Sequence, residues 1–305
     1  MDLILNVLEQ GLLFGIVSIG VYITYKILDF PDLSVDGTYP LGAAICAALL
    51  VKDINPYIAV LVATFGGAIA GLITALLNVK LKITNLMSGI LVMIGLYSIN
   101  LKIMGQSNIP LFNTKNIFNE NNKILIIFLV VIIIKILFDV FLKTKLGSLL
   151  IAVGDNEQLV TSLGVNKNNI KILGLMISNG LVALSGALTA QYQGFSDITM
   201  GTGVVVMGLA AVIIGSSIFK KLSLVKATTL SIVGAIIYKL AIALAIKWKL
   251  DPNYLKLMTS IIVIVALSFN SNIFKIKSKK RISKKDRLKE SGDINAEDSK
   301  VVQGL

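Results

Sequence analysis

GDNEQLVTSLGVN, at residues 154–166, is a polar run that lies between two apolar segments, each long enough to cross a bilayer. The pattern predicts a short amphipathic helix between two glycine corners, Gly154 and Gly164, because glycine lets the backbone turn sharply at little steric cost. Its acidic start suits the N-terminus of a helix. The apolar side would be formed by Leu159, Val160 and Leu163, and the polar side by Asp155, Asn156, Glu157 and Gln158. Such a helix either lies on lipid headgroups or binds a partner protein.

The composition of the chain indicates a membrane protein. Apolar residues make up 55% of the 305 residues, charged residues make up 15%, and the mean hydropathy is +0.83. Such a chain has too little polar surface to cover a soluble globule. The absence of histidine and the single cysteine, Cys46, exclude histidine acid–base chemistry, the usual zinc sites and an internal disulfide. No Walker lysine motif occurs, so we expect no ATP hydrolysis by this chain, no catalytic residue, no metal and no cofactor.

Apolar windows of about 20 residues, the length of one membrane span, occur nine times, and two of them are short. The candidate spans are residues 5–28, 38–51, 57–78, 84–104, 122–142, 170–190, 203–219, 222–246 and 254–271. We therefore expect an all-α polytopic membrane protein with about nine transmembrane helices.

The basic residues predict the orientation of these spans. Lysines and arginines gather at 275–289, directly after the last span, and should remain in the cytoplasm beside anionic lipid. The N-terminus is then outside and the run 154–166 is inside. The chain divides into a transmembrane permease domain, residues 1–272, and a basic, largely disordered cytoplasmic tail, residues 273–305. A lipid anchor explains the basic tail without a nucleic-acid partner.

One sequence pattern occurs twice. FPDLSVDGT at 30–38 and FSDITMGTG at 195–203 share an aromatic residue, an aspartate, aliphatic and hydroxyl residues, and a glycine-bearing turn. An odd number of predicted crossings separates the copies, so they enter the membrane from opposite sides, as the inverted repeats of transporters do. Each copy is predicted to be a broken helix, interrupted by Pro31, Gly37 and Pro40 in the first copy and by Gly194, Gly201 and Gly203 in the second. Broken helices are tolerated in a membrane only against protein or a water-filled cavity.

The polar side chains of the repeat can satisfy the backbone groups that a broken helix leaves free. Asp32 and Asp197 are predicted to cap the helices that follow them, with direct contact to a solute as the alternative. The candidate translocation pathway comprises Asp32, Ser34, Gly37, Thr38, Asp197, Thr199, Gly201 and Gly203. Lys239 has no acidic neighbour in its own span, so it either extends to the outer interface or faces the pathway.

These features together resemble a known family. The loop 154–166, the DLSV stretch at Asp32–Val35 and SNGLVALSGALTAQYQGFSD at Ser178–Asp197 are similar to the permeases of branched-chain amino acid and ribose ABC importers. Within that family the chain looks most like the tryptophan/tyrosine or uncharacterised-substrate permeases, over nearly all of residues 1–270. Ribose permeases carry a glycine after DLSV, whereas this chain has Asp36, so ribose is not carried over as the substrate.

The resemblance implies a fold like that of vitamin B12-importer (type II) permeases, with two inverted repeats. It also implies a homodimer in a bacterial cell membrane, paired with cytoplasmic ATPase subunits and with an extracellular lipoprotein or periplasmic solute-binding protein. The transported solute would be small, an aromatic amino acid such as tryptophan or tyrosine. The residues expected to couple to the ATPase are Gly154, Asp155, Asn156, Glu157, Leu159, Leu163 and Gly164.

Two other classes of protein share some of these features. An ion-coupled secondary transporter also has inverted repeats and broken helices, but it is expected to hold a charged coupling group near the midplane, for which Lys239 is the one candidate. A receptor or structural membrane protein would have no use for two broken helices in inverted positions. The sequence therefore favours the permease of an ATP-driven importer.

Overall fold

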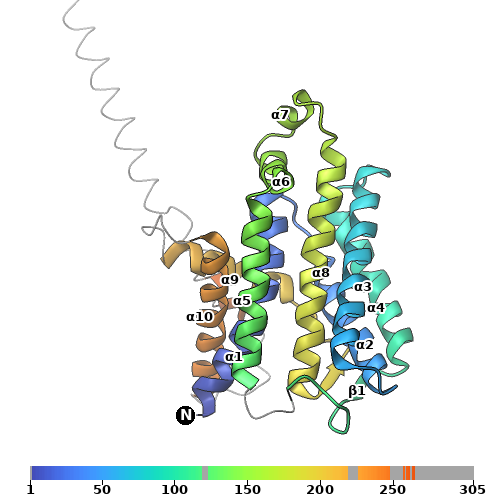
Figure 1. The fold of residues 1–305 in the computed structure, drawn as a ribbon, viewed down its shortest axis with the longest axis vertical. Helices are drawn as coiled ribbons and strands as arrows, with labels where there is room; N and C mark the ends of the chain where they lie inside the picture. The colour runs from blue at the N-terminus through green and yellow to red at the C-terminus, as the bar shows by residue number, and fades with distance from the viewer. Residues whose placement is uncertain are drawn as a thin grey trace, which may run out of the picture. The chain divides into compact units, whose positions relative to one another are not determined.

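The computed structural model describes residues 2–118, 123–218, 226–247, 257, 259–261 and 263–264. The chain divides into two compact units, Met1–Val263 and Ile264–Leu305, and only the first is described below. Its helices are α1 (Asp2–Tyr22), α2 (Val35–Leu50), α3 (Pro56–Val79), α4 (Asn85–Met104), α5 (Lys123–Leu142), α6 (Lys145–Asp155), α7 (Glu157–Ser162), α8 (Lys167–Gln193), α9 (Val204–Ile218) and α10 (Ala227–Lys247). A π-helical turn, η1 (Ile23–Ile27), extends α1, and the strands β1 (Asn108–Pro110) and β2 (Phe195–Asp197) form one antiparallel pair (Figure 1).

Six helical segments are long and apolar enough to cross a membrane, judged by length and composition. They are Ile4–Ile27, Pro56–Val79, Asn85–Met104, Lys123–Leu142, Lys167–Gln193 and Ala227–Ala245. The apolar helices α2 and α9 are shorter. Together these helices account for every predicted span except 254–271, most of which lies outside the described residues, as does the predicted tail at 273–305.

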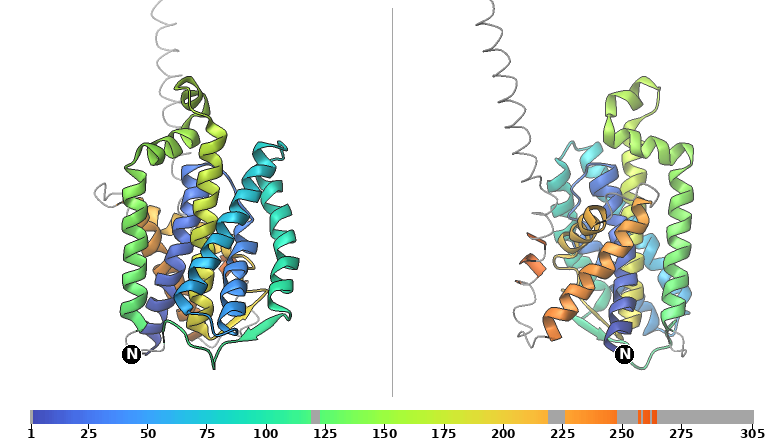
Figure 2. Two further views of the ribbon diagram at one scale, coloured as in Figure 1. Left: turned by 45° about the vertical axis from the view of Figure 1, so that its right-hand side comes forward. Right: turned by 90° about the vertical axis from the view of Figure 1, so that its left-hand side faces the viewer.

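The helix α8 lies at the centre of the bundle, with α1, α2 and α3 packed against it (Figure 2). Glycine permits the close approach of α3 to α8. A Cβ atom at Gly71 would overlap the carbonyl oxygen of Leu175, and a Cβ at Gly67 would overlap the side chain of Ala183. Two buried serines of α8 bond α1: Ser178 Oγ donates to the carbonyl of Gly20 and Ser185 Oγ to that of Leu13, both at 2.7 Å.

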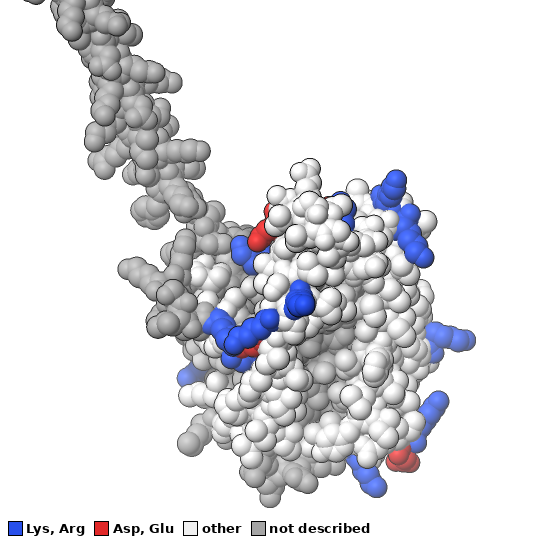
Figure 3. Space-filling model, turned by 45° about the horizontal axis from the view of Figure 1, so that its top comes forward, with Lys and Arg blue, Asp and Glu red and all other residues white. Residues whose placement is uncertain are grey.

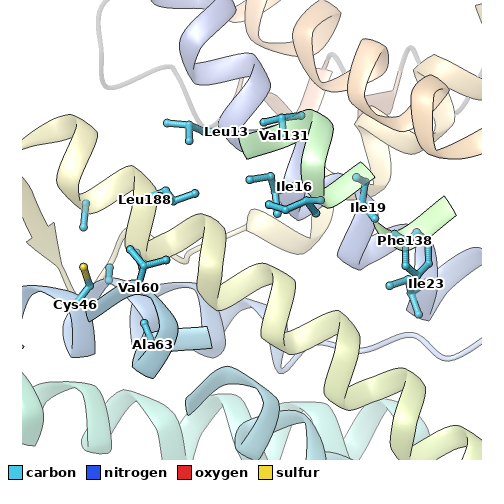
Figure 4. Close-up of a cluster of buried hydrophobic side chains, with 14 of the residues drawn as sticks. Leu13, Ile16, Ile19, Ile23, Cys46, Val60, Ala63, Val131, Phe138 and Leu188 are labelled. Atoms are coloured by element: carbon cyan, nitrogen blue, oxygen red, sulfur yellow. The ribbon is translucent and has the colours of Figure 1, made fainter. Parts of the chain in front are cut away.

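A continuous apolar core joins the long helices. Leu13, Ile16 and Ile19 of α1 are buried in one cluster with Val131 of α5 and Leu188 of α8 (Figure 4). The one cysteine, Cys46, is also fully buried in this cluster. This core fixes α1, α5 and α8 relative to one another.

Two non-helical segments lead into the short helices from opposite ends of the bundle. The first, residues 28–34, starts at the end that carries α6, where Ile27 contacts Gly154. The second, residues 198–203, starts at the end that carries the β1–β2 pair, where Ile198 N–H donates to the carbonyl of Ser107 at 3.0 Å. The two copies of the repeated pattern therefore run into the bundle in opposite directions.

Candidate functional site

The polar loop at 154–166 forms a short helix at one end of the bundle, beyond the N-terminus of α8 (Figure 1). This helix, α7, is six residues long. Asn156 caps it, because its Oδ1 accepts from the N–H groups of Gln158 at 2.9 Å and Leu159 at 3.2 Å. Gly164 follows it with a φ of +75°, which confirms the predicted second glycine corner.

The first predicted corner, Gly154, is not a corner. Gly154 and Asp155 are the last residues of α6, a helix that the sequence analysis did not predict. A Cβ at Gly154 would overlap the carbonyl oxygen of Ile27 in η1, so glycine is needed here for close packing and not for a turn. The turn between α6 and α7 lies at Asn156, whose backbone is extended.

The three apolar residues of the loop do not share one side, which corrects the prediction. Val160 is 0% exposed and belongs to the main core cluster. Leu159 is 53% exposed and Leu163 is 64% exposed. The helix is therefore anchored through Val160, while Leu159 and the C-cap residue Leu163 are exposed.

Ion pairs hold α7 against α8. Lys167 Nζ lies 2.6 Å from Glu157 Oε2, and Lys171 Nζ pairs with Oε1 of the same carboxylate. The hydrogen bonds from Lys167 and Lys171 lower the pKa of Glu157, so this carboxylate stays ionised at neutral pH. Figure 3 turns this end of the bundle toward the viewer and shows basic side chains around it with few carboxylates.

The first copy of the repeat forms a buried polar network with α8. Asp32 Oδ1 accepts from the backbone N–H of Ser34 at 2.8 Å and from its Oγ at 2.6 Å. Asn179 Nδ2 donates to Asp32 Oδ2 at 2.8 Å, and Thr38 Oγ1 donates to Asn179 Oδ1 at 2.7 Å. The four side chains are almost fully buried. Asn179 was not among the predicted residues, although an asparagine inside an apolar span was a signal for it.

The second copy repeats the geometry of the first. Asp197 Oδ1 accepts from the backbone N–H of Thr199 at 2.7 Å and from its Oγ1 at 2.6 Å. Both aspartates thus close a turn two residues further on, as aspartates in turns commonly do. This corrects the predicted capping role of both aspartates, because the N-cap of α2 is Ser34, with no side-chain cap hydrogen bond, and α9 begins only at Val204.

The helix α9 is capped from the other copy of the repeat. The carboxylate of Asp36, in the first turn of α2, accepts from the N–H of Gly203 at 2.9 Å and from that of Val205 at 2.8 Å. In the sequence, Asp36 is notable only as a departure from the ribose permeases, and its role at α9 was not predicted. Asp36 therefore joins the two copies and satisfies donors at the start of α9.

The helix α2 is not interrupted at Gly37 or Pro40 as predicted, whereas Pro31 does lie in the non-helical segment before it. The helix begins at Val35, so Gly37 and Pro40 lie inside it, and the non-helical part of this copy ends at Ser34. Pro40 has no N–H, which removes the helical hydrogen bond to the carbonyl of Asp36. Gly201 packs against this position, since a Cβ there would overlap the Asp36 carbonyl oxygen. The proline thus serves the contact between the two copies.

A cavity of about 510 Å³ lies beside this contact, between α2, α4 and residues 198–202. Gly37 and Thr199 of the predicted pathway line it, together with Asp36. Asp32, Ser34 and Thr38 are instead enclosed in the network with Asn179. Of the eight predicted pathway residues, two therefore line this cavity and three belong to the polar network. Asp197, Gly201 and Gly203 belong to neither group.

Residues 3–276 match the family described as "Branched-chain amino acid transport system / permease component". The chain belongs to this family. This confirms the resemblance found in the sequence, and it makes the permease a multi-pass membrane protein and a transport component, not an enzyme.

Individual relatives agree with the family. The tyrosine transport system permease protein of Clostridioides difficile (strain R20291) is 54% identical to the permease over 266 residues, 87% of this chain and 90% of that protein. The ribose import permease protein RbsC of Escherichia coli (strain K12) is 24% identical over 220 residues, 70% of this chain and 68% of that protein. The solved structure of PsaBC from Streptococcus pneumoniae in complex with Fab has a TM-score of 0.51 and 17% identity, covering 87% of this chain and 88% of that one. At that identity the likeness concerns the fold alone.

Proposed function

We propose that the permease is the membrane-spanning subunit of an ATP-driven importer of an aromatic amino acid, with tyrosine as the first candidate. Cytoplasmic ATPase subunits would bind α7, and an extracellular lipoprotein or periplasmic binding protein would deliver the solute. The relative that is a tyrosine transport system permease supports the choice of solute. The observation that carries the ATPase contact is the pair of exposed leucines, Leu159 and Leu163, on a capped helix outside the main bundle.

The proposed protein crosses the membrane nine times and acts as a dimer. The short helices α2 and α9 and the apolar run 254–271 would complete nine crossings in a fold like that of vitamin B12-importer permeases. Two copies of the chain would form the dimer, which the mass of the purified complex tests. The end that carries α6 and α7 would face the cytoplasm, and the β1–β2 pair would lie outside.

Two paths of contact lead from α7 to Asp32. The first runs through α6, where Gly154 lies against Ile27 of η1, the turn directly before the segment that holds Asp32. The second runs through α8, which Glu157 binds at one end and which carries Asn179, the hydrogen-bond partner of Asp32. A force applied to α7 by a closing ATPase would therefore reach the first broken helix by both routes, and α9 through Asp36.

Reconstitution tests the function directly. Proteoliposomes that contain the permease, its ATPase subunits and the binding protein should accumulate radiolabelled L-tyrosine when ATP is present on the ATPase side. A proton or sodium gradient without ATP should give no accumulation, because the energy is proposed to enter through α7. Accumulation driven by an ion gradient in the permease alone would favour the secondary transporter instead.

Cysteine labelling tests the orientation. Asn113 and Gln158 are both exposed. Gln158 belongs to α7, and Asn113 follows β1, which lies at the opposite end of the bundle from α7 (Figure 1). In a Cys46→Ala background, Asn113→Cys should react with an impermeant maleimide added to intact cells, and Gln158→Cys should react only after the membrane is opened. The opposite pattern would reverse the orientation and remove α7 from the reach of a cytoplasmic ATPase.

A further inference from the structure

A second cavity, of about 170 Å³, lies between α1, α2, α8, α9 and α10. Its walls include Phe14, Tyr39 and Met200, with Gln10 and Gln193 also lining it and with Lys239 from α10. Gln193 lies two residues before β2, so the cavity is in the half of the bundle that the proposed orientation places toward the outside. An engineered protein cavity of about 150 Å³ binds benzene, so this one has room for part of a small solute.

Lys239 is the charged group of this cavity. Its Nζ lies 5.1 Å from the centre of the Phe14 ring, and no ion pair with it occurs in the part of the chain that the structure describes. Lys135 and Lys226, by contrast, both pair with Asp139. An ammonium group inside a membrane protein is costly without a counter-charge, and such groups usually serve a pathway. Of the two roles left open by the sequence, the geometry fits the one in which Lys239 faces a cavity.

The other side chains that line this cavity determine which kind of anion can bind beside Lys239. Within the described ranges, no hydrogen bond involves the side-chain amide of Gln10 or that of Gln193, so both can bind a zwitterion. Phe14, Tyr39 and the methionines Met200 and Met207 offer apolar and aromatic surface. One cation with neutral amides and aromatic walls suits a single carboxylate on a partly apolar molecule better than a phosphate.

Residues in or directly after both copies of the repeat line this cavity. Tyr39 directly follows the first copy in α2. Met200 belongs to the second copy, which Asp36 holds to the first, and Val204 directly follows it at the start of α9. Movement of the broken helices would therefore change the walls around Lys239.

We propose that Lys239 binds the carboxylate of an α-amino acid as it passes through the permease, an inference that rests on the proposed import function. The test uses the permease–ATPase complex in nanodiscs without the binding protein, with tritiated L-tyrosine as the probe in a scintillation proximity assay. Lys239→Gln should weaken binding at least tenfold, and Lys239→Arg should retain most of it. Lys247→Gln, an exposed lysine of the same helix, is the matched control and should bind as the wild type does.

Tyramine, which is tyrosine without its carboxylate, supplies a test on the unmodified complex. It should fail to displace L-tyrosine at concentrations at which unlabelled L-tyrosine displaces it fully. Equal displacement by tyramine, tyrosine binding by Lys239→Gln that equals the wild type, or no tyrosine binding by the wild-type complex would each overturn the assignment. If Lys239→Gln fails to assemble on size exclusion, the tyramine result decides.

The two proposals fail in different ways. ATP-driven uptake by the wild-type system together with unchanged binding in Lys239→Gln would leave the importer standing and remove only the role of Lys239. An absence of ATPase association or of ATP-driven uptake would instead remove the import function itself.

Discussion

Asp36→Ala should destabilise the permease by about 3 kcal/mol and abolish most of its uptake. The estimate follows from the two hydrogen bonds of a partly buried carboxylate to backbone N–H groups, each of which is worth about 1.5–3 kcal/mol when one partner is charged. The variant leaves the N–H groups of Gly203 and Val205 without this acceptor. It also removes the bond that joins α2 to the start of α9, so both broken helices should loosen together.

A graded set of variants separates this effect from the general loss of a carboxylate. Asp36→Asn keeps one acceptor oxygen and should fall between wild type and alanine. Asp197→Ala removes a carboxylate that, among the described residues, bonds Thr199 and the side chain of Asn108 near the surface. It should cost about 1 kcal/mol, the usual net value of a hydrogen bond. Thermal unfolding of each purified variant in nanodiscs measures the order of their stabilities, and uptake measures the order of their activities. Equal melting temperatures for Asp36→Ala and Asp197→Ala would contradict the role given to Asp36.

Local patterns in the sequence predicted the elements whose conformation is determined by neighbouring residues. The apolar windows located the long helices because each span must satisfy its own backbone hydrogen bonds in lipid. The run 154–166 predicted a short helix with a corner at Gly164, where a left-handed backbone favours glycine. The repeated pattern predicted equivalent roles for Asp32 and Asp197. In the structure both close the same kind of turn, although the predicted role was to cap a helix.

The predictions were wrong or incomplete at residues whose role depends on a contact with a part of the chain that is distant in sequence. Gly154 looks like a turn glycine in the sequence, but it is required by the carbonyl of Ile27, a contact that no local pattern reveals. The same holds for Asp36, whose partners Gly203 and Val205 lie in the other half of the chain. The helix α6 was missed because its 11 residues are too few for a membrane span, the length for which the apolar windows were chosen.

The second large effect is expected from substitutions of the exposed leucines at α7. Leu159→Asp combined with Leu163→Asp should reduce ATPase co-purification at least tenfold and reduce uptake with it. Burying a leucine side chain stabilises a contact by about 1.5–3 kcal/mol, and about 1.4 kcal/mol corresponds to a factor of ten in affinity. Because both leucines are more than half exposed, at 53% and 64%, the substitutions should leave the permease folded and inserted.

Leu81→Asp is the matched control for that double variant. Leu81 is 66% exposed and follows α3 at the same end of the bundle, but it lies outside the loop 154–166. It should retain both ATPase association and uptake, since the proposal restricts the contact to α7. Equal loss in the Leu81 variant would mean that the whole end of the bundle, and not α7, binds the ATPase. Full association by the double variant would show that the exposed leucines are not the contact, and the ATPase would then have to bind the permease elsewhere.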